Sequence, residues 1–181
     1  MSDPRRYLPG DRPAKTEVAQ AIRVDHAGEY GAARIYAGQL AVLGRGANGD
    51  LLRHMQAQEQ HHLETFNGLI ADRRVRPTVM LPFWHVAGFV LGAATAALGD
   101  KAAMACTVAV EETIDAHYRS QVETLTDEPA LCETIETFRA EEVEHRDIGL
   151  EHGAEQAPGY RALSRLIRAG CRAAIRISER L

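Results

Sequence analysis

Glu142-Val-Glu-His145 is the stretch that decides the fold, and Glu59-Gln-His-His62 repeats its pattern earlier in the chain. A Glu and a His three positions apart lie on one face of an α-helix, so both side chains can reach one metal ion. Each pair follows a further glutamate, since Glu29 precedes Glu59 by 30 positions and Glu111 precedes Glu142 by 31. The doubled pattern therefore offers four carboxylates and two imidazoles.

Helical register separates the glutamates of this pattern from their neighbours. Glu111 shares its helical face with Val108, whereas Glu112 shares its face with Arg119. This indicates that Glu111 points inward and Glu112 points to solvent. The other three glutamates of the pattern also lie on apolar stripes. Surface salt bridging would explain any one of them, but buried glutamates without partners are rare and costly, so the set as a whole indicates a metal site.

The long stretches between a few Pro and Gly breaks have helical period, and strand-like alternation is absent. We expect two helical hairpins, residues 16–76 and 101–156, joined by an apolar crossover, 77–100, and followed by a basic amphipathic helix, 159–181. In each hairpin the two glutamates lie at similar numbers of residues from the turn. At a helical rise of ~1.5 Å per residue, they therefore lie at similar heights along the bundle axis. The prediction is an all-α fold: one ferritin-like four-helix bundle domain over residues 1–181, with ligands from all four helices.

Composition narrows the class of protein. The net charge of −4 gives no reason to expect nucleic-acid binding. Three scattered cysteines form no CxxC pair, which is typical of a reducing compartment. Residues 1–15 lack the apolar core of a secretory signal, so we expect a bacterial cytoplasmic chain or a trimmed mature one.

Residues 77–99 contain no Asp, Glu, Lys or Arg. Their length would allow a transmembrane helix, which needs about 20 apolar residues. A single span, however, would place Glu59 and Glu142 on opposite sides of the membrane, and the metal site could not assemble. We therefore expect the segment to stay on one side, either in the membrane interface or as a buried connecting helix. Arginines just before it and Trp84 within it favour the interface.

The last helix carries arginines at spacings of three and four, which form one basic face. They are Arg161, Arg165, Arg168, Arg172, Arg176 and Arg180. Apolar residues populate the opposite side. A basic amphipathic helix is typical of membrane-surface binding, and the alternative is a solvated face on a helix packed against the core.

Glutamate oxygens and imidazole nitrogens suit iron and manganese, and no cysteine joins the set. Asp25, four positions before Glu29, could be the hydrogen-bond partner of a ligand histidine, or could form a surface salt bridge. Tyr118, seven positions after Glu111 on the same face, could relay a proton or an electron, or could be an ordinary core residue.

Several stretches resemble the demethoxyubiquinone hydroxylase family, and the resemblance covers nearly the whole chain. They are Ile22-Arg-Val-Asp-His-Ala-Gly-Glu-Tyr-Gly31, Arg74-Val-Arg-Pro-Thr-Val79, Met104-Ala-Cys-Thr-Val-Ala-Val-Glu-Glu112 and Ala169-Gly-Cys-Arg172. The resemblance implies a di-iron monooxygenase, with two Fe ions per chain, that hydroxylates a 2-polyprenyl-3-methyl-6-methoxy-1,4-benzoquinol with O2 in ubiquinone biosynthesis. Its implied metal ligands are Glu29, Glu59, His62, Glu111, Glu142 and His145.

The same resemblance implies a peripheral protein on the cytoplasmic face of the bacterial inner membrane, or on the mitochondrial inner membrane for a trimmed eukaryotic chain. Gly44-Arg-Gly-Ala-Asn-Gly49 matches the dinucleotide pattern GxGxxG, but it follows a predicted helix rather than a strand, which indicates an interhelical turn and no nicotinamide-binding fold. We therefore expect electrons from an external reductant or through the quinone. Other ubiquinone-biosynthesis proteins are further expected partners, and nucleic acid is not.

A polyprenyl tail is costly in water, at ~0.8 kcal/mol per methylene, so residues 83–98 are predicted to form the mouth and wall of the substrate channel. Two other functions stay open at this point: a ferritin-type iron store or ferroxidase, and a metal-free helical interaction module. A soluble iron store needs neither the uncharged segment nor the arginine helix.

Overall fold

The computed structural model describes residues 16–181, and the stretch 1–15, excluded above as a secretory signal, lies outside the described residues. The described chain contains helices and no strand, which confirms the all-α prediction. The elements are α1 (Thr16–Leu43), α2 (Gly49–Asp72), α3 (Leu81–Ala97), α4 (Asp100–Thr124), α5 (Pro129–Glu151), the short 3-10 helix η1 (Ala154–Gln156) and α6 (Tyr160–Ser178).

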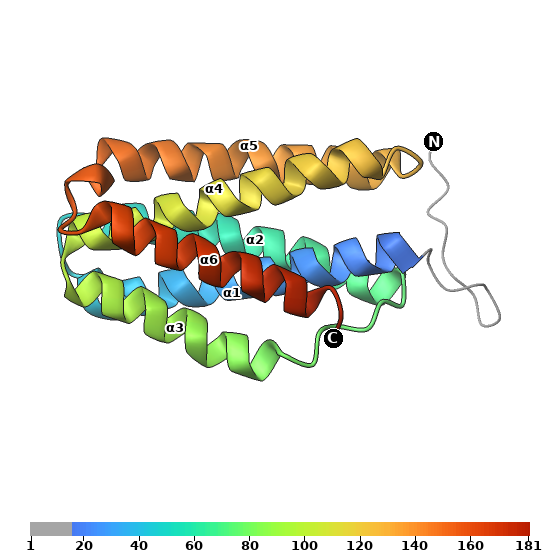
Figure 1. The fold of residues 1–181 in the computed structure, drawn as a ribbon, viewed down its shortest axis with the longest axis horizontal. Coiled ribbons are helices and arrows are strands. Elements are labelled where there is room, and N and C mark those ends of the chain that lie inside the picture. Colours follow the sequence, from blue (N-terminus) through green and yellow to red (C-terminus); the bar gives the residue numbers. More distant parts are fainter. Residues whose placement is uncertain (1–15) are drawn as a thin grey trace.

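The helices α1, α2, α4 and α5 form the four-helix bundle, and α3 and α6 lie on its outside (Figure 1). Prolines stand in the first turns of α3 and α5, where the missing N–H would have no helical partner. Gly153 and Gly159, with φ of 82° and 69°, turn the chain between α5 and α6 in the left-handed region that favours glycine.

Two apolar clusters fill the bundle, one toward each end. The first includes Ile22, Phe66, Tyr118, Ile135 and Phe138. The second includes Tyr36, Leu52, Met55, Met104 and Val108. On each of the four helices the predicted ligands fall between these two clusters along the chain. The apolar clusters therefore separate the middle of the bundle from solvent at both ends.

The crossover helix α3 packs so closely on α1 that the backbones of the two helices are in contact. A Cβ atom on Gly92 would overlap the carbonyl of Ile35, and one on Gly38 would overlap the carbonyl of Phe89. This close approach explains why glycine stands at these positions. The apolar segment thus stays on the bundle, and within residues 16–181 no helix has the length and apolarity needed to cross a bilayer.

The last helix, α6, packs mainly on α4. Ile167 of α6 is buried in a cluster with Cys106 and Ala109 of α4. At its far end α6 also meets the start of α3, since Trp84 Nε1 donates a hydrogen bond to Ser178 Oγ at 3.2 Å. Both outer helices therefore cover the same side of the bundle (Figure 1).

Candidate metal centre

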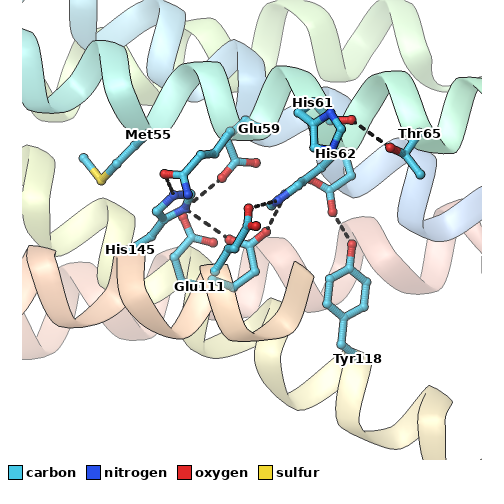
Figure 2. A network of polar contacts seen from close by, with 12 residues as sticks. Met55, Glu59, His61, His62, Thr65, Glu111, Tyr118 and His145 are labelled. Carbon is cyan, nitrogen blue, oxygen red and sulfur yellow. Dashed lines mark hydrogen bonds and ion pairs between the residues drawn. The ribbon is translucent and has the colours of Figure 1, made fainter. Parts of the chain in front are cut away.

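The six side chains of the doubled pattern converge in the middle of the bundle. Each has at most 1% of its surface exposed. They come from all four bundle helices: Glu29 from α1, Glu59 and His62 from α2, Glu111 from α4, Glu142 and His145 from α5. Figure 2 shows Glu59, His62, Glu111 and His145 turned toward one another. All four glutamates therefore point into the bundle, as their helical register predicts, and the two histidines point there with them.

These residues form two overlapping groups that could each hold a metal ion. One contains Glu29, Glu59, His62 and Glu142, and the other contains Glu59, Glu111, Glu142 and His145. Within each group, ligand atoms from all four residues lie within 4.8 Å of one another. Glu59 and Glu142 belong to both groups, so a carboxylate could bridge two neighbouring ions. The described residues contain no other such group.

Both histidines turn Nδ1 toward the carboxylates. His62 Nδ1 lies 3.1 Å from Glu142 Oε1 and 3.3 Å from Glu29 Oε2. His145 Nδ1 lies 3.0 Å from Glu59 Oε1 and 3.4 Å from Glu142 Oε2. Each imidazole therefore belongs to one group, while Glu142 contacts both imidazoles.

The atoms that face the centre are the ones whose hydrogen bonding is incomplete. Eight buried atoms of the six residues have no hydrogen-bond partner: Glu29 Oε2, Glu59 Oε1 and Oε2, His62 Nδ1, Glu111 Oε2, Glu142 Oε1 and Oε2, and His145 Nδ1. Burying so many unsatisfied polar atoms would be destabilising unless they had another partner. Oxygen and imidazole donors are ligands that divalent transition metals accept, so the residues fit a metal centre.

Proton affinities in the cluster are strongly shifted. Burial and the charge of Glu142 raise the pKa values of Glu59 and Glu111 well above their ordinary range. Burial alone would lower the pKa of His62, but its contacts with Glu142 and Glu29 raise it to about 12. Burial would raise the pKa of Glu142, but its contacts with His145 and His62 lower it to about 2. A bound cation would displace the protons that Glu59, Glu111 and His62 hold.

Two tyrosines form hydrogen bonds with Glu29 and Glu111, the two glutamates that each belong to only one metal-binding group. The Tyr118 hydroxyl donates a hydrogen bond to Glu29 Oε1, and the Tyr36 hydroxyl donates one to Glu111 Oε1 at 3.1 Å. Tyr118 reaches the cluster from α4 (Figure 2). Its contact with Glu29 is compatible with a relay, and that role stays a prediction. The sequence pattern did not single out Tyr36, although it stands seven positions after Glu29 as Tyr118 does after Glu111.

The Nε2 atoms of the two histidines, which face away from the centre, have partners that the sequence pattern did not predict. His62 Nε2 lies 2.8 Å from Glu141 Oε2, and His145 Nε2 lies 3.0 Å from Gln58 Oε1. Each partner directly precedes the glutamate of a Glu-x-x-His pair and reaches across to the histidine of the other pair. That shared position is the signal by which they could have been found.

Asp25, predicted as a possible partner of a ligand histidine, lies elsewhere. Its buried carboxylate accepts a hydrogen bond from Gln121 Nε2 at 2.8 Å and lies 3.3 Å from His117 Nε2. His117 does not belong to either metal-binding group. The outer nitrogens of His62 and His145 already contact Glu141 and Gln58, and burial of Asp25 also excludes a surface salt bridge.

Glu112 does not belong to either metal-binding group, but it does not face solvent as predicted either: it is half-buried and pairs with Arg168 of α6. One arginine of the basic face is therefore engaged with the bundle.

The fold and the centre together define a class: ferritin-like helical bundles with a carboxylate and histidine cluster that can hold metal. Residues 16–178 match the family of ubiquinone biosynthesis protein COQ7. The chain is 60% identical over 176 residues to the 3-demethoxyubiquinol 3-hydroxylase of Rhodospirillum rubrum, covering 96% of this chain and 83% of that one.

Two mitochondrial proteins are also similar to this chain. Identity is 56% over 176 residues to the human NADPH-dependent 3-demethoxyubiquinone 3-hydroxylase, mitochondrial, with 94% of this chain and 81% of the relative covered. It is 39% over 180 residues to the 5-demethoxyubiquinone hydroxylase, mitochondrial, of Saccharomyces cerevisiae, with 90% and 77% covered. The chain belongs to the COQ7 family, which confirms the resemblance seen in its sequence.

Proposed function

We propose that this chain hydroxylates the ring of a demethoxyubiquinol with O2 at a centre of two iron ions. The observation that carries the proposal is the pair of buried Glu/His groups that share Glu59 and Glu142. The relatives are named as hydroxylases of demethoxyubiquinol or demethoxyubiquinone, which supports this activity over the iron-store alternative. The eight unpartnered atoms that face the centre argue against a metal-free interaction module.

In this proposal Glu29 and His62 would hold one ion and Glu111 and His145 would hold the other, and Glu59 and Glu142, which belong to both groups, would serve both ions. Four carboxylates balance the charge of two divalent ions, so the filled centre carries no net charge in an apolar surrounding. When bound, the two ions supply the activation of O2 that ring hydroxylation needs. Iron meets this need because it accepts these ligands and changes oxidation state.

The surrounding residues exclude water and fix the ligands. The apolar clusters at both ends of the bundle separate the centre from solvent. The hydroxyls of Tyr118 and Tyr36 orient the carboxylates of Glu29 and Glu111. A dry, pre-oriented site protects a reactive oxidant and strengthens its electrostatic interactions.

The outer helices offer a surface for a membrane. On α3, Phe83, Val86 and Val90 are exposed by 58%, 59% and 56% and recur at helical spacing. On α6, Leu166 is 72% exposed, beside a row of exposed arginines. Apolar side chains of this size mark interaction surfaces, and arginines beside them attract anionic lipid. We infer peripheral binding of α3 and α6 to the inner membrane of a bacterium or mitochondrion.

We propose that the apolar cluster between the outer helices and the bundle leads from this surface toward the centre. Leu91 of α3 and Leu163 of α6 pack against Ile35 and Val110, and Val110 directly precedes Glu111. A quinol ring could reach the ions along this cluster while its prenyl tail stays in lipid. The pocket between α1, α4 and the end of α6, about 240 Å³ in volume, is unsuited to a tail because Glu17, His117 and Glu179 line it.

Electrons would come from an external reductant or through the quinol. The human relative is named NADPH-dependent, which makes a reduced nicotinamide the first donor to test. Other proteins of ubiquinone biosynthesis are further candidate partners of the exposed surface.

The test is a single-turnover reaction of the iron-loaded, reduced chain with a demethoxyquinol and ¹⁸O2. We expect a ring-hydroxylated product that carries one ¹⁸O atom, identified by mass spectrometry. Oxidation and retention of added iron without ring product would instead support the ferroxidase alternative.

A further inference from the structure

The hydrogen bonds around the cluster repeat the twofold pattern of the sequence. Tyr118 of α4 holds Glu29 of α1, and Tyr36 of α1 holds Glu111 of α4. In each case the tyrosine stands seven positions after a glutamate of the pattern. The two halves of the centre therefore have equivalent support for their outer carboxylates.

The two histidines do not have equivalent support. The partners of their Nε2 atoms occupy equivalent sequence positions, one before each Glu-x-x-His pair, but one is Glu141 and the other is Gln58. The distance to the carboxylate is 2.8 Å, and the distance to the amide oxygen is 3.0 Å. A charge thus stands behind His62 where a neutral group stands behind His145.

We propose that Glu141 makes the group of Glu29, Glu59, His62 and Glu142 the tighter of the two metal sites, so that the first ion binds there. The inference rests on the two-ion centre of the proposed function. It assigns Glu141 and Gln58 as positioning residues that make the two halves of a symmetric centre unequal.

The physical reason is the acceptor that each Nε2–H group faces. A carboxylate accepts a stronger hydrogen bond than an amide oxygen does, because it is charged. The stronger bond draws the proton away from the ring and makes Nδ1, the atom that faces the centre, a better donor to a cation. It also adds negative charge on the His62 side. Removing such an outer partner typically weakens metal binding by about 10–100-fold.

Phe138 adds a second constraint on the same side. Its ring stacks on His62 with centroids 4.0 Å apart and planes 26° apart. Tyr36 meets His145 only edge-on, with centroids 6.0 Å apart. His62 is therefore held both by stacking and by the carboxylate, which keeps Nδ1 aimed at the centre before an ion arrives.

The experiment is an anaerobic titration of the metal-free full chain with Co²⁺, followed by its visible absorption. The wild type should take up two ions in steps that differ by at least about tenfold in affinity. Glu141→Gln should weaken the first step by about 10–100-fold, so that the two steps converge. Gln58→Glu should tighten the second step and leave the first one unchanged.

Glu144→Gln is the matched control, because it removes the same charge from an exposed position on α5. It should leave both steps unchanged.

Equal affinities of the two steps in the wild type, or an unchanged ratio of these affinities in Glu141→Gln, would overturn the inference while the two-ion centre stands. Equal weakening of both steps would do the same, since it would show a merely structural role. Failure of the wild type to bind two ions would instead overturn the proposed function, and this inference with it. Gln58→Glu keeps the test decisive if Glu141→Gln does not fold.

Discussion

The middle of the bundle and the outer surface of α3 and α6 both reverse the ordinary arrangement of a globular protein. The first buries four carboxylates, and the second exposes large apolar side chains such as Phe83 and Leu166. The two regions differ in how closely their side chains are held in place. The centre holds six side chains from four helices within a few ångströms of one another, whereas the outer apolar side chains face solvent. Under the proposed function, this difference suits a metal ion of fixed coordination geometry at the centre and a fluid membrane at the surface.

The largest effect should follow from a change at the heart of the centre. Glu142→Ala removes a carboxylate that belongs to both metal-binding groups and contacts both histidines. Turnover should fall by more than the roughly 10–100-fold typical of an outer partner, and bound iron should fall with it. Metal analysis and the hydroxylation assay measure the two losses together.

Two neighbouring variants provide controls for Glu142→Ala. Glu144→Ala changes an exposed residue of the same helix, and Glu112→Ala changes the residue next to Glu111, which pairs with Arg168. Both should retain iron. Loss of iron in Glu112→Ala, or its retention in Glu142→Ala, would show that the inward register is misassigned.

The outer surface should respond in a different way. Phe83→Asp combined with Val90→Asp places charge on the exposed face of α3, without touching the centre. Losing the burial of even one such side chain in lipid amounts to about 1.5–3 kcal/mol, or roughly tenfold or more. Turnover of a long-tailed quinol should fall by that factor, and turnover of a tail-less quinol should fall far less.

The matched control for this surface is Val42→Asp, since Val42 is an exposed apolar residue of α1. It should affect both substrates little. If the α3 variant lost both activities equally, or lost iron, the surface would belong to the core and the comparison would fail.

The charges of the centre should also set the stability of the metal-free chain. His62, with its pKa raised to about 12 from 6.5, contributes stability that is present below pH 6.5 and is lost as the pH rises toward 12. The raised pKa values of Glu59 and Glu111 act in the same direction. The Tm of the metal-free chain should therefore fall between about pH 6.5 and 9, by roughly 2–4 °C per kcal/mol.

Calorimetry of the metal-free and iron-loaded chains measures this difference. The loaded chain should show a much flatter profile, because the ions have displaced the protons. A Tm of the metal-free chain that rises over this range would contradict the assigned shifts.

The smallest effect per residue should come from the arginines of α6. Changing Arg165, Arg172 and Arg176 to Gln should weaken binding to anionic liposomes by about fivefold for each residue, at ~1 kcal/mol per charge near the surface. The loss should shrink as salt rises, because exposed charges are screened over roughly 8 Å at physiological ionic strength. A sedimentation assay over a salt series measures it.

Changing Arg53, Arg119 and Arg146 to Gln alters the net charge equally on other helices, and should leave liposome binding nearly unchanged. Equal losses in both triple variants would mean that net charge, rather than the α6 face, governs membrane binding.

The sequence predicted most of the fold because helical period shows which face of each helix is buried. The same period correctly indicated that Glu111 and Glu142 point inward and that Glu112 does not. It could not show that Glu141 and Gln58 reach the opposite histidines, because this depends on how α2 and α5 are aligned along their axes. For the same reason the contact of Asp25 with His117 and the pairing of Arg168 with Glu112 appear only in the structure.

The proposed function requires that the buried cluster hold two ions through shared carboxylates. Anomalous diffraction at the iron edge from crystals of the iron-loaded chain tests it most directly. Two peaks are expected, about 3.5–4 Å apart, with Glu59 and Glu142 beside both. One peak should lie beside Glu29 and His62, and the other beside Glu111 and His145. A single peak, or iron bound only outside the bundle interior, would contradict it.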